Sequence, residues 1–137
     1  GATFPLDLYI MIGECEEIAA GLYQYHPKVH TLALIKEGDL REELMATALG
    51  QSMIKNAPAT IIFTAQYKRT TKRYDDRGVM YVHNEVGHVS QNIYLQCETL
   101  GLGTVAIGAF EDDKASDFMQ FQEGKKVVYM MPVGYVK

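Results

Sequence analysis

Tryptophan is absent from this 137-residue sequence, and proline and cysteine are scarce, with four and two residues. The two cysteines lie in unlike settings, Cys15 in a Gly-Glu-Cys-Glu-Glu turn and Cys97 in an apolar stretch. Because nothing in the sequence indicates that the two cysteines pair with each other, we expect two free thiols rather than a disulfide. Free thiols indicate a reducing compartment, so the sequence predicts a cytoplasmic protein.

Long apolar runs and blocks of basic residues are also missing. No stretch approaches about 18 consecutive apolar residues and no basic start precedes an apolar run, which argues against a membrane span and a signal peptide. The formal charge is −4, and the four basic residues between Lys68 and Arg73 are followed by two acidic residues, Asp75 and Asp76. We therefore expect no nucleic acid and no membrane among the partners.

The remaining composition is that of one folded domain. Apolar residues make up 47% of the sequence and charged residues 22%, far from the values of disordered chains. A single soluble domain over residues 1–137 is expected, burying roughly 65–70% of the surface of its unfolded chain. The sequence begins with Gly1 rather than Met, and we expect that residues upstream have been lost.

Residue patterns predict the strands. Leu6–Ile12 alternates between apolar and other residues, which is typical of a strand with one buried face. Leu22–Tyr25 and His30–Ile35 flank a turn that contains proline and predict a hairpin. Ala59–Ala65 is nearly all apolar or threonine and predicts a central strand covered on both faces. Val127–Val133 predicts the last strand.

The strongest helix signal covers Arg77–Leu100, where apolar residues recur at steps of three and four without a proline. At about 1.5 Å per residue this helix would run some 36 Å, more than one small domain buries alone. A second row of residues along this helix is small or amphipathic: His83, Gly87, Ser90 and Tyr94. Two packed faces predict a subunit interface. A shorter amphipathic helix, capped by Asp39, is expected to end at Gly50.

Two familiar motifs do not fit their usual roles. The segment 101–106 matches G-x-G-x-x-A, but a dinucleotide-binding turn needs a strand before it and a helix after it, and here the order is reversed. We expect these glycines to end the helix through a left-handed cap. His83 and His88 are five residues apart on one helix, about 140° around its axis, and His26 and His30 span a turn. We expect no metal site.

The segment Gly103–Phe110 carries the clearest signal for a ligand. Thr104–Ile107 predicts a short strand, and Gly108 and Ala109 follow it with almost no side chain. Exposed backbone N–H groups at such a place can bind the edge of a flat ring. A tight turn between a strand and a helix explains the same spacing, so both interpretations stay open.

Tyr74 stands among charged residues immediately before the long helix. Its spacing alone favours a surface tyrosine that packs a loop. The functional alternative is a proton donor at a cleft, because tyrosine suits a boundary between water and apolar groups.

Taken together, several motifs resemble the nitroreductase superfamily. The residues that carry the resemblance are, in order, Tyr81-Val82-His83-Asn84-Glu85-Val86-Gly87-His88, Gln91-Asn92, Leu100-Gly101-Leu102-Gly103, Ile107-Gly108-Ala109-Phe110 and Met131-Pro132-Val133-Gly134. The opening Gly1–Tyr9 is similar to the end of a motif of the SagB-type dehydrogenases, the branch that includes azoline-forming heterocycle oxidases, with Asp7 where Glu is usual. The resemblance covers the whole chain.

The resemblance implies an α+β fold with a mixed sheet flanked by helices, and a homodimer whose interface contains the Arg77–Leu100 helix. It implies FMN as cofactor, held between the subunits, with Ile107, Gly108 and Ala109 beside the flavin ring. Gly1 and Ala2 would belong to a loop that touches FMN. A small organic substrate and NAD(P)H would be the reaction partners.

Two departures from the family pattern bear on function. Heterocycle oxidases carry a Lys-Tyr pair that assists proton removal, and the matching positions here are Arg73 and Tyr74. Arginine stays charged and is a poor base, although Tyr74 is kept as the candidate catalytic residue. Relatives also carry an N-terminal Arg-Arg-Ser segment that grips the FMN phosphate, which these residues lack. A flavin oxidoreductase, a non-catalytic flavin-binding dimer and an azoline oxidase therefore remain as alternatives.

Overall fold

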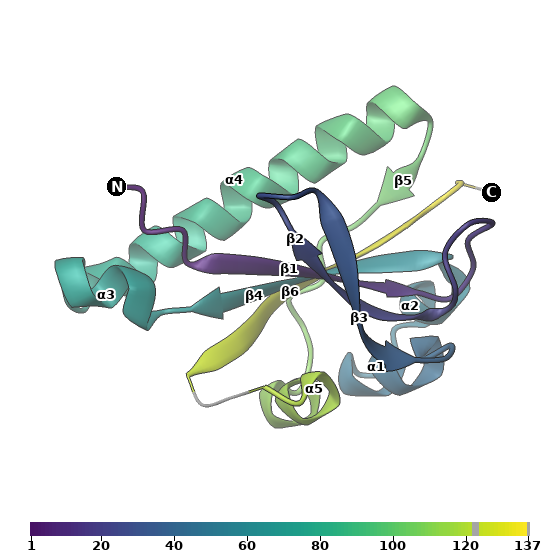
Figure 1. The fold of residues 1–137 in the computed structure, drawn as a ribbon, viewed down its shortest axis with the longest axis horizontal. Coiled ribbons are helices and arrows are strands. Elements are labelled where there is room, and N and C mark those ends of the chain that lie inside the picture. The colour runs from purple at the N-terminus through teal and green to yellow at the C-terminus, as the bar shows by residue number, and fades with distance from the viewer. Residues whose placement is uncertain (122–123, 137) are drawn as a thin grey trace.

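The computed structural model describes residues 1–121 and 124–136, which form an α+β fold as expected (Figure 1). The strands are β1 (Leu6–Ile12), β2 (Gly21–His26), β3 (Thr31–Glu37), β4 (Ala59–Gln66), β5 (Gly103–Thr104) and β6 (Lys125–Gly134). The helices are α1 (Arg41–Thr47), α2 (Ser52–Asn56), α3 (Lys68–Tyr74), α4 (Arg77–Leu100) and α5 (Asp112–Met119). Among the described residues, no helix is long and apolar enough to cross a membrane.

The six strands form one sheet in the order β3-β2-β1-β4-β6-β5. Every pairing between the described strands is antiparallel, which differs from the mixed sheet that the resemblance implied. The path of the chain explains the direction of β6. Helix α4 carries the chain from the Gln66 end of β4 back to the opposite end, and the following segment returns it, so that Lys125 pairs with Gln66.

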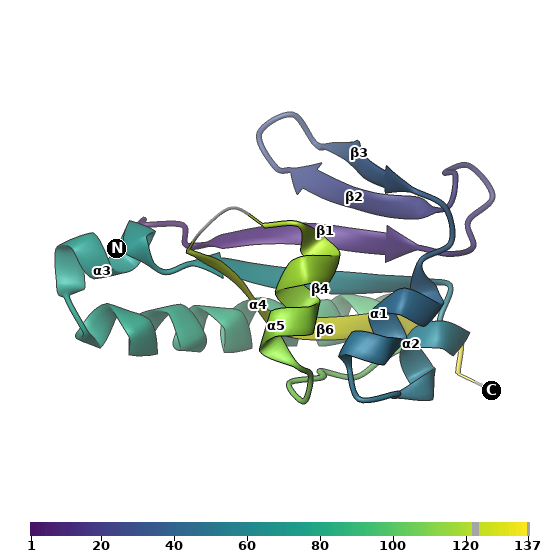
Figure 2. The ribbon, with the colours of Figure 1, turned by 90° about the horizontal axis from the view of Figure 1, so that it is seen from below.

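Helices cover both faces of the sheet. Figure 1 views the sheet close to edge-on, with α4 on one side and α1, α2 and α5 on the other. In Figure 2 the last three helices lie in front of the strands and α4 lies behind them. A cluster of buried residues joins β1 and β6 to α1, α2 and α5, and includes the fully buried Met11, Leu44, Ile54 and Met130. Both faces of β4 are covered, as predicted.

Helix α4 has the bounds that its residue spacing predicts, Arg77–Leu100. One face packs on the sheet through the buried residues Val82, Val86, Ser90 and Cys97, while the buried Gly78 lies against the backbone of α3. The second predicted face is covered only in part, since Ser90 is buried while His83 and Gly87 are exposed. Several large apolar side chains of α4 also face solvent: Val79, Met80, Tyr81, Leu95 and Leu100. The single chain therefore leaves much of this helix uncovered.

The end of α4 confirms the predicted left-handed cap. Gly101 has φ +67°, and the backbone N–H of Leu102 donates to the carbonyl of Cys97 at 2.8 Å. Glycine adopts this conformation without the strain that a Cβ would add. The glycines thus end a helix, and the dinucleotide-binding interpretation is excluded by the order of the elements.

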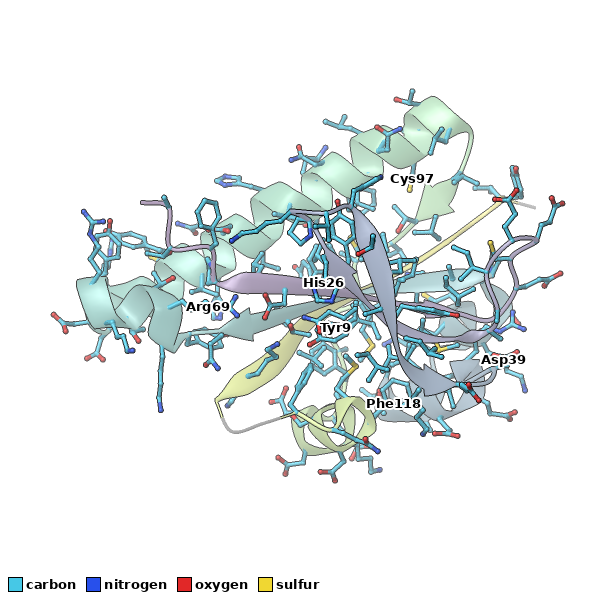
Figure 3. The ribbon with its side chains drawn as sticks, viewed as in Figure 1. Tyr9, His26, Asp39, Arg69, Cys97 and Phe118 are labelled. Carbon is cyan, nitrogen blue, oxygen red and sulfur yellow. The ribbon has the colours of Figure 1, made fainter. Side chains whose placement is uncertain are left out.

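Helix α1 begins one residue later than predicted. Leu40 occupies the cap position and is buried, while the Asp39 carboxylate accepts hydrogen bonds from the backbone and guanidinium of Arg41. The helix ends at Thr47, and the separate helix α2 follows Gly50. Figure 3 shows Asp39 at the α1 end of the molecule and Cys97 on α4. Cys15 is exposed and Cys97 buried, and both are free thiols as expected.

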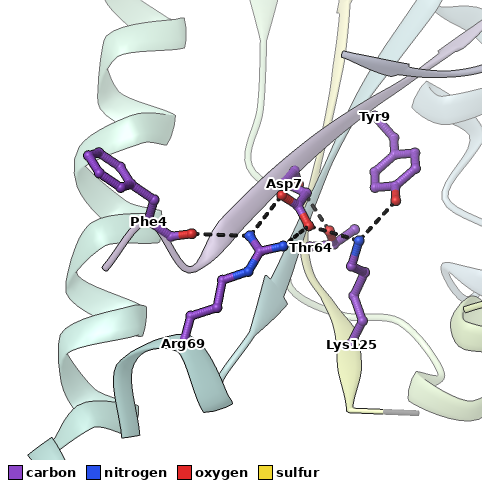
Figure 4. A network of polar contacts seen from close by, with 6 residues as sticks. All are labelled: Phe4, Asp7, Tyr9, Thr64, Arg69 and Lys125. Atoms are coloured by element: carbon purple, nitrogen blue, oxygen red, sulfur yellow. Dashed lines mark hydrogen bonds and ion pairs between the residues drawn. The ribbon is translucent and has the colours of Figure 1, made fainter. Parts of the chain in front are cut away.

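A polar network fixes the N-terminal segment to the sheet (Figure 4). The Asp7 carboxylate accepts two hydrogen bonds from Arg69, at 2.9 and 3.0 Å, and pairs with Lys125 at 2.8 Å. Arg69 also donates to the carbonyl of Phe4 at 3.1 Å, and Lys125 donates to the Tyr9 hydroxyl. The network joins β1, α3 and β6, and so it positions the residues that precede β1.

Candidate functional site

The segment after β5 is anchored at Ile107. The Ile107 N–H donates to the carbonyl of Met130 at 2.8 Å, and the Met130 N–H donates back at 3.0 Å. The Ile107 side chain is only 3% exposed, and it belongs to the main core cluster. One residue earlier, the N–H of Ala106 donates to the Tyr94 hydroxyl on α4 at 2.7 Å. Instead of the continuous strand predicted for 104–107, the chain forms the two-residue β5 and an isolated bridge.

Gly108 and Ala109 behave differently from Ile107, because both are exposed. The Ala109 carbonyl accepts a hydrogen bond from the Gln51 side chain at 2.9 Å, which fixes the direction of this peptide. Within the described residues, the N–H groups of Gly108 and Ala109 have no hydrogen-bond partner. A Cβ at Gly108 would lie 3.2 Å from Cε1 of Tyr129, so a side chain there would crowd the ring. Two adjacent amide donors are therefore presented without a side chain between them.

A pocket of about 420 Å³ lies beside Gly108. Its lining comes from α4, the 108–112 segment and β6: His83, Val86, Gly87, Gly108, Phe110, Asp112, Val127, Val128 and Tyr129. On α4, a Cβ at Gly87 would meet no atom within 4 Å, so this glycine keeps the wall open. The volume suits a small planar group, and Gly108, whose N–H has no partner among the described residues, is part of the lining.

His83, which lines the pocket, makes a contact that the sequence analysis missed. The Tyr67 hydroxyl lies 2.7 Å from Nε2 of His83, and the two rings meet edge to face. Burial, with a smaller contribution from the charge of Asp112, raises the pKa of Tyr67. The sequence places His83 in a row of amphipathic residues on α4, with His88 as a candidate metal pair and within a family motif, but indicates no partner for it. Nothing in the sequence pairs it with Tyr67, because the contact depends on how α4 crosses the end of β4.

The predicted catalytic Tyr74 lies in a second pocket, of about 350 Å³. Its lining brings Tyr74 together with two predicted cofactor residues and four others: Gly1, Ala2, Thr3, Thr70, Tyr81 and Glu85. The Tyr74 hydroxyl contacts the amino group of Gly1, and the Arg73 guanidinium lies 5.4 Å from the centre of the Tyr74 ring. Gly78 allows α3 and α4 to approach, since a Cβ there would lie 3.0 Å from the Thr71 backbone.

The two pockets lie on opposite flanks of α4. The Tyr74 pocket uses Glu85 from this helix, whereas the Gly108 pocket uses Gly87. These two residues are separated by about 160° around the helix axis. Within one chain, the structure therefore brings Gly1, Ala2 and Tyr74 to one place and Ile107, Gly108 and Ala109 to another.

The donor set beside Gly108 suits the ring of a flavin better than its phosphate. Backbone N–H groups and a glycine wall fit the edge of a flat heterocycle. A phosphate needs cationic or helix-terminal donors, and no Lys or Arg is among the described residues that line this pocket. Arg69 and Lys125 are both paired with Asp7. The described lining of this pocket therefore has a backbone donor suited to a ring edge and no cation suited to a phosphate.

Comparison with known proteins places this geometry in a family. The profile of the nitroreductase family matches residues 2–135. A relative from Methanocaldococcus jannaschii, named "Putative nitroreductase MJ1384", is 42% identical over 134 residues, which are 98% of this chain and 67% of the relative.

Two solved structures share the fold. The crystal structure of "a putative nitroreductase" from Anabaena variabilis superposes with a TM-score of 0.90 at 30% identity, over 97% of this chain and 27% of that one. The Escherichia coli microcin synthetase McbBCD complex, with truncated pro-MccB17 bound, contains a chain with a TM-score of 0.88 at 19% identity, which shows a common fold. The superposition covers 100% of this chain and 54% of that chain. The profile match and the 42% identity show that the chain belongs to the nitroreductase family.

Proposed function

We propose that this chain forms the flavin-ring site of an FMN-dependent oxidoreductase. The observation that supports this most directly is the pair of exposed N–H groups at Gly108 and Ala109, which have no partner among the described residues. Of the two, Gly108 lines the pocket to which Gly87 also contributes. Bound there, FMN would supply hydride chemistry between NAD(P)H and a small organic acceptor. The protein's part is to hold the ring edge and limit access to one face.

The chain's own residues set the environment of the ring. The amides of Gly108 and Ala109 would donate toward the edge of a bound ring and would favour negative charge there. Ile107 lies beneath them in the core and fixes their direction through its bridge to Met130. Val86 and Phe110 line the same pocket and exclude water from part of it.

We propose that the complete site requires two copies of the chain, packed through α4. Tyr74, Gly1 and Ala2 lie on one flank of α4 and Gly108 lies on the other, so a single chain cannot place them around one ring. A second copy against α4 would cover its exposed apolar side chains, including Met80, Leu95 and Leu100. The dimer proposal fails if the protein sediments as a monomer at micromolar concentration.

A non-catalytic flavin- or ligand-binding dimer is the second candidate. It is favoured by the lack of a cation among the described residues that line the Gly108 pocket, since the phosphate grip contributes much of the affinity for FMN. This chain also spans 67% of its curated relative, so the activity of a longer protein is not transferred to it directly.

An azoline oxidase that acts with a peptide-modifying partner is the third candidate, suggested by the resemblance of Gly1–Tyr9 to the motif of the SagB-type dehydrogenases. Arg73 argues against it, because its guanidinium remains charged and lies over the Tyr74 ring at 5.4 Å. If azoline oxidation is found, Tyr74→Phe should abolish it. Unchanged turnover would remove Tyr74 from the mechanism.

The absorbance spectrum of the purified protein separates the first two candidates. Flavin bands between about 350 and 480 nm that bleach on addition of NAD(P)H would support the oxidoreductase. Mass spectrometry of the released ligand would identify FMN. Bands that persist with every electron donor would favour the non-catalytic dimer, and a colourless protein that also fails to take up FMN would contradict the flavin proposal for this chain.

A further inference from the structure

Tyr67 and His83 make a contact beside the Gly108 pocket that ring binding alone does not require. Tyr67 lies at the junction of β4 and α3, and His83 lies on α4, sixteen residues later in the sequence. The ring centroids are 5.7 Å apart with planes at 85°, and the hydroxyl is 2.7 Å from Nε2. Two elements that are separate in the sequence thus hold one imidazole edge in place.

The tautomer of His83 sets the direction of its hydrogen bond with Tyr67. The Tyr67 side chain is partly buried, and His83 is the one hydrogen-bond partner of its hydroxyl within residues 1–121 and 124–136. Burial, and then the negative charge of Asp112, raise the pKa of Tyr67 and favour the phenol form, which can donate to the Nε2 lone pair. In that arrangement His83 carries its proton on Nδ1.

The polar groups that line the pocket indicate what the Nδ1–H group of His83 binds. Of the side chains described in its lining, three carry polar atoms, His83, Asp112 and Tyr129. Ionised Asp112 can only accept hydrogen bonds, and it repels an oxygen that carries partial negative charge. A substrate that presents such an oxygen is therefore oriented away from Asp112 and toward the donors.

We propose that His83, held in the Nδ1–H tautomer by Tyr67, is a substrate-binding donor that selects acceptors whose reducible group carries an oxygen, such as a quinone carbonyl. This inference rests on the proposed function, because it assumes that the substrate enters the pocket beside the ring. His83 contacts the substrate, and Tyr67 acts through His83 as a positioning residue.

The tautomer can be measured without any cofactor or turnover. Histidine ¹⁵N spectra of the purified protein at a pH of about 8 should show His83 with its proton on Nδ1. In Tyr67→Phe the Nε2–H form should appear, while exposed His88 on the same helix should not change. An unchanged tautomer ratio of His83 between the two proteins would overturn the proposal.

Steady-state kinetics tests the substrate role in the flavin-loaded protein. His83→Phe should raise KM for a naphthoquinone roughly two- to tenfold, the value of one hydrogen bond, and leave kcat within about twofold. Tyr67→Phe should raise the KM for the naphthoquinone by a smaller factor. The KM for a phenazinium dye, an acceptor without oxygen, should stay the same, and His26→Phe on the β2–β3 hairpin serves as the matched control. A quinone KM that does not change, or a dye KM that rises equally, would overturn the proposal.

Failure of the flavin proposal has a different signature. If the protein takes up no FMN, kinetics cannot be run, but the tautomer and the response of the His83 N–H signal to added naphthoquinone are still measurable. A Tyr67-dependent tautomer with a quinone-induced shift supports the inference on its own. A signal that does not respond to the quinone overturns it.

Discussion

Replacing Asp7 by Asn should lower the free energy of unfolding by about 2 kcal/mol. Asp7 is 20% exposed and pairs with Lys125, which is 18% exposed, so removing its charge leaves a partly buried ammonium without a counter-ion. The bond to Arg69 adds less, because the Arg69 side chain is 40% exposed and water screens the pair. Urea unfolding should show a midpoint lowered by about 1 M. Asp117→Asn, at an exposed position on α5, is the matched control.

The Asp7 effect should depend on pH. Burial acts to raise the pKa of Asp7, but hydrogen bonds and charges from Arg69 and Lys125 outweigh it and hold the pKa below its ordinary value of 3.8. A carboxyl with a lowered pKa stabilises the fold above its unfolded pKa, and this contribution is lost as the pH falls through the folded pKa. The gap between wild type and Asp7→Asn should therefore be full at neutral pH and shrink in strong acid.

Two results would refute this reasoning. A variant as stable as wild type at neutral pH would mean that the network in Figure 4 contributes no net stability. A gap of constant size down to strong acid would mean that Asn disturbs packing, and that the charge of Asp7 is not the cause.

Two further predictions concern the core and the thiols. Ile107→Ala should destabilise the protein by about 2–4 kcal/mol in urea unfolding, because the side chain is 3% exposed and its removal leaves a cavity under the 108–109 amides; a loss below about 1 kcal/mol would show that the site does not depend on this anchor. Exposed Cys15 should react with a disulfide reagent at a pH of about 8 at the rate of a free thiol, whereas Cys97 should react only on unfolding, because burial, and then the charge of Glu98, raise the pKa of Cys97. Equal rates for the two thiols in the native protein would contradict the packing of α4.

Strong periodic patterns predicted the fold well. The bounds of β1 and α4 were predicted to the residue, because seven alternating residues and twenty-four helical ones each carry several independent cues. Helix α2 was missed, since five residues hold barely more than one turn and give no repeating apolar pattern. The Asp39 cap was wrong because the buried Leu40 stands at the cap position and the Asp39 carboxylate binds the Arg41 guanidinium.

The site was predictable only in part. The exposure of Gly108 and Ala109 could be expected from their lack of large side chains. The resemblance sets Ile107 beside the ring as well, and the structure shows its side chain buried and its N–H bonded to Met130. The contact between Tyr67 and His83 could not be predicted, because no local spacing relates a residue after β4 to one on α4. The separation of Tyr74 from Gly108 also depends on which flank of α4 each meets, which only the assembled fold shows.

The most direct test of the flavin site is a titration of the protein with FMN, followed by flavin fluorescence and absorbance. Wild type should bind the flavin, and Gly87→Leu should abolish binding, because a leucine there fills the open wall beside Gly108. The substitution should not disturb folding, since Gly87 is exposed on a helix and leucine is the better helix former. Ala46→Leu, at an exposed position on α1, should bind FMN as wild type does. Equal FMN binding by wild type and Gly87→Leu, or no binding by either, would contradict the assignment of this pocket.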